Sequence, residues 1–102
     1  MASKTQSTKP SRVAVKERPV VICTEYRGVF FGYATDTSKD VVKLRGAKMA
    51  ISWGSNRKGV MDLAKSGPSK DDRISASADI ELRKITAIFE VTKEAEAAWA
   101  LR

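Results

Sequence analysis

Residues 41–53 read VVKLRGAKMAISW, and this stretch decides the fold. It begins as a β-branched run, continues past Gly46, and then alternates, so that Met49, Ile51 and Trp53 share one face. Alternation with a period of two indicates an amphipathic β-strand. A glycine inside such a pattern is typical of a β-bulge or kink. We therefore expect a strand that is kinked at Gly46.

Two strands are expected before this stretch. Residues 20–24 and 29–35 are rich in β-branched and aromatic side chains, as strands prefer. Arg27 and Gly28 between them predict a hairpin, and residues 36–40 form a polar turn cluster.

The C-terminal half predicts two helices and weaker strands. The expected elements are a short helix over residues 60–66 closed by Gly67-Pro68, a weak edge strand over 74–80, a strand over 82–91, and a helix over 93–101 capped by Thr92. Trp99 on the last helix is expected to face the body of the protein. These elements predict an α+β fold: a small, strongly bent antiparallel sheet or partly open barrel, with one inserted short helix and a C-terminal helix.

Positive charge is concentrated near the N-terminus. The 102 residues carry a net charge of +7. Residues 1–18 contribute +4, from five cations against the single anion Glu17; the cations are Lys4, Lys9, Arg12, Lys16 and Arg18. A polar segment of this kind buries too little apolar surface to offset the entropy of ordering it. We predict a flexible basic arm over 1–18 and a single α+β domain over 19–102, since the length suits one domain.

The composition excludes several kinds of site. The chain has no histidine and a single cysteine, Cys23, which excludes Ser-His-Asp and Cys-His catalysis, imidazole metal ligands and thiolate-rich zinc sites. Asp71 and Asp72 match no calcium loop. No run approaches the roughly 20 apolar residues that span a bilayer. We expect a cytoplasmic protein that is not an enzyme and uses no cofactor, metal or membrane.

Two basic groups are candidate anion-binding sites. Trp53 and the loop after it, GSNRKG, place two cations and two glycines before a helix, which suits a phosphate, and the indole could stack on a base. Lys43 and Arg45 project to one side of their strand, and a bulge at Gly46 would bring Lys48 to that side. The alternatives are a solvated loop and a solvated or edge-protecting strand face. The candidate residues are Lys43, Arg45, Lys48, Trp53, Asn56, Arg57 and Lys58.

Most of the seven aromatic residues are expected in the core, because a domain of this size needs large side chains to fill it. Tyr26, Tyr33 and Trp53 lie near predicted turns, so we expect these three to be exposed. The arm has three interpretations: it binds nucleic acid or an acidic protein surface, it solubilises the chain, or it orders between subunits of an assembly.

The chain contains a set of short motifs: GVFFG at 28–32, VVKL at 41–44, Ala47-Lys48 leading to Trp53-Gly54, Leu63-Ala64 with Gly67, Arg73-Ile74-Ser75, and residues 85–92. As a set, these motifs resemble a family of small uncharacterised tailed-phage proteins. The resemblance covers roughly residues 20–95 and implies a viral origin and a small β-rich fold. Lys48 stands where the family tends to have arginine, and residues 49–51 are poorer in aromatics.

These observations lead to a function hypothesis of the binding class. We expect a phage accessory protein of the host-takeover or counter-defence type, a homo-oligomer in the host cytoplasm. It would act stoichiometrically on an anionic target: nucleic acid, a nucleotide signal, a host nucleoprotein or another acidic host protein surface. The alternative is a minor virion or capsid component whose basic arm orders between subunits.

Overall fold

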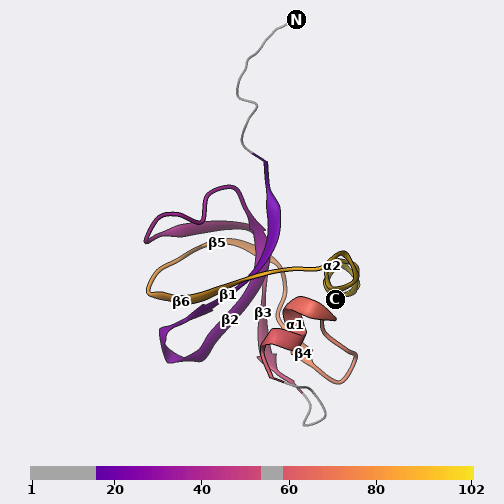
Figure 1. Cartoon of the computed structure of the whole chain (residues 1–102). Helices are drawn as coiled ribbons and strands as arrows, with labels where there is room; N and C mark the ends of the chain where they lie inside the picture. Colours follow the sequence, from indigo (N-terminus) through magenta and orange to yellow (C-terminus); the bar gives the residue numbers. More distant parts are fainter. Residues whose placement is uncertain (1–15, 54–58) are drawn as a thin grey trace, which may run out of the picture.

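The computed structural model describes residues 16–53 and 59–102 (Figure 1). The elements in chain order are β1 (Arg18–Thr24), the 3₁₀ turn η1 (Glu25–Arg27), β2 (Gly28–Ala34), β3 (Val42–Ser52), α1 (Met61–Lys65), β4 (Arg73–Ile74), β5 (Ala78–Leu82), β6 (Ile85–Glu90) and α2 (Lys93–Ala100). The strands form one antiparallel sheet in the order β4-β3-β2-β1-β6, with β5 paired to β3.

Strand β3 organises the sheet. It is 11 residues long and pairs with β2 along one edge and with β5 and then β4 along the other. Gly46 has a φ of 61°, and the register with β5 shifts between Leu44 and Ala47. The predicted kink at Gly46 is therefore confirmed, and glycine suits it because a left-handed φ strains other residues.

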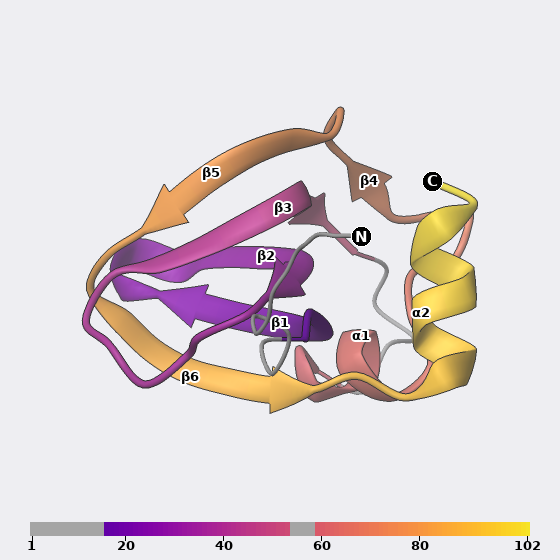
Figure 2. The ribbon, with the colours of Figure 1, turned by 90° about the horizontal axis from the view of Figure 1, so that it is seen from above.

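The sheet curls into a barrel that does not close. Two residues, Arg83 and Lys84, join β5 to β6. In the described part of the chain, however, β5 pairs with β3 and β6 with β1, and not with each other. Figure 2 shows the two strands diverging from the turn that joins them. The predicted α+β fold with a partly open barrel, a short inserted helix and a C-terminal helix is confirmed.

Both faces of the central strands are buried, in two separate cores. The barrel core consists of Val20, Ile22, Ala34, Val42, Leu44, Ala47 and Leu82. The helix-side core consists of Val21, Val29, Phe31, Ala50, Leu63, Ala64, Ala95 and Trp99. Successive β1 residues alternate between the two because neighbouring side chains of a strand point to opposite faces.

Helix α2 is anchored by Trp99, which is fully buried as the sequence predicts. The indole stacks on Phe31 with ring centres 4.9 Å apart, and its N–H donates to the Leu63 carbonyl at 3.0 Å. Thr92 caps the helix, accepting from the Ala95 N–H at 3.0 Å. Gly67 has a φ of 81°, and a Cβ there would lie 2.5 Å from that of Ala98, so glycine lets this turn approach α2.

An amphipathic strand is expected to bury its apolar face, but the apolar face of β3 is partly exposed. Met49, Ile51 and Trp53 do share a face, but they are 36%, 48% and 36% exposed, while Ala50 between them is buried. Ala50 lies in the helix-side core, where its small side chain lets the helix layer pack close to the strand. Alternation therefore identified the strand, and the packing of the helices determined which face is covered.

Several element boundaries also differ. The expected strand over 74–80 is two strands, β4 and β5, and Leu82 ends β5 instead of starting the strand that follows. Strand β1 begins at Arg18, one residue before the boundary expected for the domain, and Arg18 forms an ion pair with Glu90. Tyr33, expected to be exposed, is partly buried, and its hydroxyl donates to Glu96 Oε2 at 2.7 Å. Burial, with this hydrogen bond, raises the pKa of Tyr33.

Candidate functional site: two clefts of opposite charge

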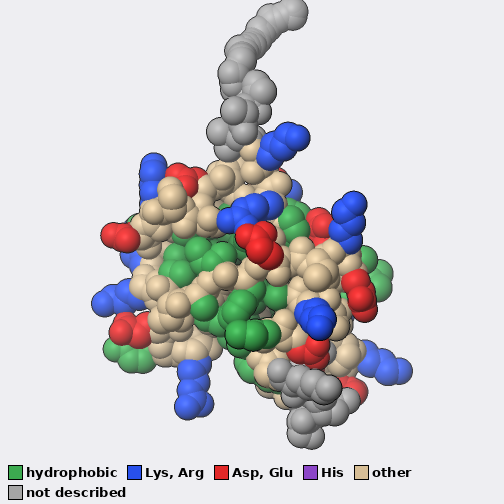
Figure 3. Space-filling view, in the orientation of Figure 1, with side chains coloured by type: hydrophobic (Ala, Val, Ile, Leu, Met, Phe, Trp, Pro, Cys, Tyr) green, Lys and Arg blue, Asp and Glu red, His purple; other side chains and the backbone are tan. Residues whose placement is uncertain are grey.

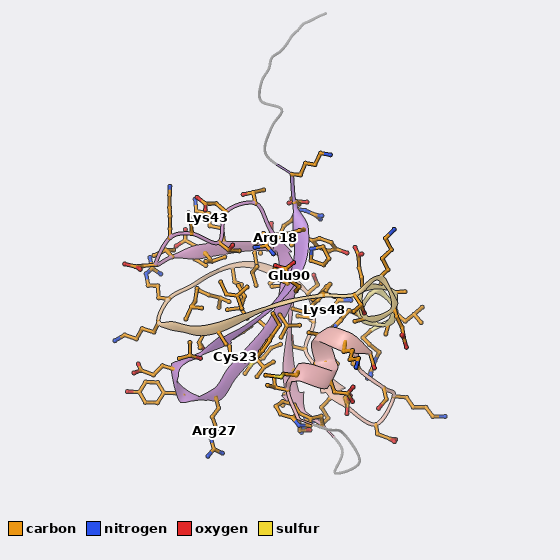
Figure 4. The ribbon with its side chains drawn as sticks, viewed as in Figure 1. Arg18, Cys23, Arg27, Lys43, Lys48 and Glu90 are labelled. Atoms are coloured by element: carbon orange, nitrogen blue, oxygen red, sulfur yellow. The ribbon has the colours of Figure 1, made fainter. Side chains whose placement is uncertain are left out.

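The predicted cation row is present on β3. Arg45 lies opposite Tyr33 and Lys48 opposite Phe31, and these two β2 residues share a face. The bulge therefore does bring Lys48 to the side of Arg45, as predicted. Figure 4 shows Lys43 near the start of β3 and Lys48 close to α2.

Each cation of this row has a partner within the protein. Arg45 Nε donates to both carboxylate oxygens of Glu17 at 2.8 Å, and its guanidinium carbon lies 4.9 Å from the centre of the Tyr33 ring. The hydrogen bond from Arg45 lowers the pKa of Glu17. Lys48 Nζ donates to the Trp99 carbonyl at 2.8 Å, where a cation offsets the negative end of the α2 dipole.

A first cleft of about 360 Å³ opens beside this row. Its lining consists of Glu17, Tyr33, Thr35, Lys43, Leu44, Arg45, Asp79, Ile80 and Glu81. Three carboxylates face two cations, so the lining has a net charge of −1. Lys43 Nζ lies 3.8 Å from Glu81 Oε2, and Asp79 Oδ1 accepts the Gly46 N–H at 2.8 Å. This cleft has no surplus of positive charge for an anion.

A second cleft of about 560 Å³ lies at the β5–β6 connection, at the open side of the barrel. Its lining consists of Thr37, Lys39, Asp40, Val41, Arg83, Lys84, Ile85 and Ile88. Three cations face one carboxylate, so the lining has a net charge of +2. The volume lies in the range of small-molecule sites, roughly 300–1,000 Å³.

The floor of the second cleft is apolar. Ile85 and Ile88 are partly buried and pack against the barrel core, and Val41 is 36% exposed. Figure 3 shows apolar side chains gathered in the opening between β5 and β6. The floor offers a surface for a ring or another apolar group.

The cations of the second cleft are only loosely paired. Lys39 Nζ lies 3.8 Å from Asp36, Arg83 Nη2 lies 3.3 Å from Glu81, and Lys84 Nζ lies 3.9 Å from Glu25. The three side chains are 76%, 65% and 75% exposed. Exposed pairs of this kind contribute about 0–1 kcal/mol, so a ligand anion can compete for these cations.

Sequence reasoning missed this cleft because its cations lie far apart along the chain. Val42, at the start of β3, pairs with Leu82, at the end of β5. The segment before Val42 and the segment after Leu82 therefore meet. The available signal was the pair Arg83-Lys84 between two apolar segments, opposite the turn cluster that contains Lys39.

The remaining predicted residues fall into two groups. Asn56, Arg57 and Lys58, with Lys4, Lys9 and Arg12 of the arm, lie outside the described residues. Among those described, Lys16 is exposed, Trp53 is 36% exposed, and Arg18 donates to Thr37 Oγ1 at 2.7 Å.

The net charge is divided unequally between the described residues and the rest of the chain. Of the 19 Lys and Arg residues, five lie in residues 1–15 and 54–58, whereas all 12 Asp and Glu lie in the described part. The described part therefore carries a net charge of +2. With so small a net charge, positive potential arises only where cations outnumber carboxylates locally, as they do in the lining of the second cleft.

The described residues show no group of His, Cys, Asp and Glu that could hold a metal ion. Cys23 is partly buried, and burial raises the pKa of its thiol. None of the helices described is long and apolar enough to cross a membrane.

The comparisons with known proteins give a family. The family model for a domain of unknown function, DUF6948, matches residues 17–99. The chain belongs to this family. The matched region of this DUF6948 protein runs from the start of β1 into α2, and it contains every residue that lines either cleft. No curated protein and no solved structure matches the chain. The resemblance to tailed-phage proteins stays a prediction.

Proposed function

We propose that this DUF6948 protein is a non-enzymatic binding protein for an anionic ligand, and that the second cleft is its binding site. The observation that supports this best is the lining of the cleft: Lys39, Arg83 and Lys84 at the rim, above a floor that includes Val41 and Ile88. This keeps the anion-binding hypothesis drawn from the sequence and moves its site from β3 and the loop after it to the opening of the barrel.

The lining favours a ligand with two chemical parts. Lysine and arginine bind phosphate and carboxylate oxygens, and arginine does so with two parallel donors. The apolar floor gains free energy only from a ligand that also has a ring or another apolar group. A nucleotide combines both parts, whereas inorganic phosphate satisfies the rim alone.

The biological role follows as part of the same proposal. A protein that binds a nucleotide or nucleic acid stoichiometrically in the host cytoplasm would act by withholding it, as expected for host takeover or counter-defence. The homo-oligomer, an acidic host protein as partner and the alternative role in the virion stay predictions.

The test compares two triple variants of the full chain. Lys39→Gln, Arg83→Gln and Lys84→Gln together remove the cations of the cleft. Lys65→Gln, Lys70→Gln and Lys93→Gln together remove the same charge from exposed residues on the helix side of the molecule. Both are titrated with labelled adenosine diphosphate by thermophoresis, at low and at physiological salt.

The cleft variant should lose at least about tenfold in affinity, because direct contacts to the phosphates are removed. The control should lose much less, since distant surface charges are screened. Equal affinity of the two variants, or wild-type affinity that does not change with salt, would contradict the proposal.

A further inference from the structure

The turn between β1 and β2 has an unusual backbone. Tyr26 has φ 65° and ψ 29°, and Arg27 has φ 68°, so two consecutive residues are left-handed. This conformation is strained for residues with a Cβ, and tight hairpins that need it usually contain Asn-Gly. Here a tyrosine and an arginine adopt it.

Contacts within the protein do not explain this choice of residues. Tyr26 is 91% exposed and Arg27 is exposed as well. Across residues 16–53 and 59–102, neither side chain makes a hydrogen bond, an ion pair or a ring contact. Figure 4 shows Arg27 pointing away from the body of the molecule. Backbone strain without a compensating internal contact points to a functional contact with another molecule.

The turn lies next to the second cleft. The Glu25 N–H donates to the Lys84 carbonyl at 2.9 Å, and Lys84 Nζ lies 3.9 Å from Glu25 Oε1. Lys84 and Arg83 line the cleft. Tyr26 and Arg27 follow Glu25 directly in the chain, so the exposed tip of the hairpin lies next to the end of the cleft that Lys84 lines.

We propose that Tyr26 and Arg27 bind a single-stranded nucleic acid whose phosphates continue to Lys84 and Arg83 at the cleft. Tyr26 stacks on an unpaired base, and Arg27 contacts the adjoining phosphate. An exposed ring beside cations is the arrangement with which proteins hold single strands without sequence preference. This inference rests on the proposed function and names its ligand class: an oligonucleotide extends from the cleft to the tip, whereas a mononucleotide fills the cleft alone.

The experiment measures the affinity of the full chain for a labelled oligothymidylate of about eight nucleotides, a length within the usual range of single-strand sites. Tyr26→Ala should weaken binding about tenfold, because one stacked base is lost, and Tyr26→Phe should stay near wild type because the ring remains. Leu101→Ala is the control, since Leu101 is 86% exposed on the helix side. The same variants are titrated with labelled adenosine diphosphate, whose affinity should be equal in all of them.

The two ligands separate failure of this inference from failure of the proposed function. If Tyr26→Ala keeps wild-type affinity for the oligonucleotide while the triple cleft variant loses it, the stacking role of Tyr26 is wrong and the cleft remains the binding site. If the cleft variant also binds both ligands as wild type does, the proposed function fails as well.

A second variant tests the strain itself. Tyr26→Asn with Arg27→Gly supplies the residues that a left-handed turn prefers, so its thermal midpoint should rise while oligonucleotide affinity falls. A midpoint that falls would remove the reason for expecting a function at this turn.

Discussion

The two clefts contain similar numbers of charged side chains but differ in what those side chains contact. In the first, Arg45 is held by two 2.8 Å hydrogen bonds to Glu17, and the carboxylates outnumber the cations. In the second, three exposed cations stand 3.3–3.9 Å from their nearest carboxylates, above an apolar floor. Lys43 of the first cleft is as loosely paired as the cations of the second, so the clefts differ in the tight Arg45–Glu17 pair and in the net charge of their linings, −1 against +2.

The difference shows why a row of cations along a strand is weak evidence for anion binding. Lys43, Arg45 and Lys48 do lie on one face, yet Arg45 and Lys48 donate to acceptors within the protein at 2.8 Å, and Lys43, although loosely paired, lies in a lining with a net charge of −1. Net charge and geometry must be considered together before a cation is counted as available.

The largest expected effect comes from reversing charge in the second cleft. Arg83→Glu with Lys84→Glu changes the lining from net positive to net negative and should lower nucleotide affinity by about 100-fold or more. Arg45→Glu, the same kind of change in the first cleft, should alter it by no more than about threefold, because Arg45 is bound to Glu17 and does not line the second cleft. Calorimetric titration of both variants checks this, and a larger loss in Arg45→Glu would exchange the roles of the two clefts.

The next effect concerns the apolar floor. Val41→Asp places a carboxylate on the floor and should weaken nucleotide binding about tenfold, because it repels phosphate and removes apolar contact. Val41 is 36% exposed, so the variant should fold normally. Val41→Thr, which is uncharged and of similar size, is the matched control in the same titration. Equal affinities of the two variants would show that the ligand does not touch the floor.

A smaller effect is expected at the bulge that positions the first cleft. Gly46→Ala should destabilise the protein by about 1–2 kcal/mol, because φ is 61° there and a Cβ meets only Ser77 Oγ, at 3.8 Å. Denaturant unfolding measures the loss, and nucleotide affinity at the second cleft should stay unchanged. Gly46→Asn should lose less, since asparagine tolerates this conformation better. Equal losses for alanine and asparagine would indicate a cause other than φ.

The smallest effect is the pH dependence of the Glu17–Arg45 pair. The folded-state pKa of Glu17 is lowered from its ordinary value of 4.5, chiefly by the hydrogen bond from Arg45. The stabilisation is therefore present above that ordinary value and is lost as the pH falls through the folded-state pKa. Unfolding free energies of wild type and Arg45→Gln should converge over this acid window. A difference that persists at the lowest pH would show that the pair does not act through Glu17 ionisation.

Much of the fold could be predicted because its signals are local. The kink at Gly46, the Thr92 cap and the burial of Trp99 all follow from a few neighbouring residues. The hairpin between β1 and β2 was predicted too, although its turn lies at Tyr26 and Arg27, one residue before the expected Arg27-Gly28. The division of residues 74–82 into β4 and β5 could not be predicted, because both strands are defined by pairing with β3. The sequence could not predict which face of β3 is exposed either, since alternation does not say which face the helices cover.

The candidate site was harder to predict than the fold. The sequence places Lys43, Arg45 and Lys48 on one face, but their acceptors, Glu17, Glu81 and the Trp99 carbonyl, come from distant segments. The cations of the second cleft meet only because β3 and β5 pair across about 40 residues of chain, a distance at which local patterns carry no information.

NMR tests the second cleft as binding site most directly, by following backbone amide shifts of the labelled full chain during titration with adenosine diphosphate. If the nucleotide binds there, the largest shifts lie at residues 37–41 and 83–88, with small changes along residues 43–48 of β3. Largest shifts at residues 43–48, or no saturable shifts at the second cleft, would contradict binding there.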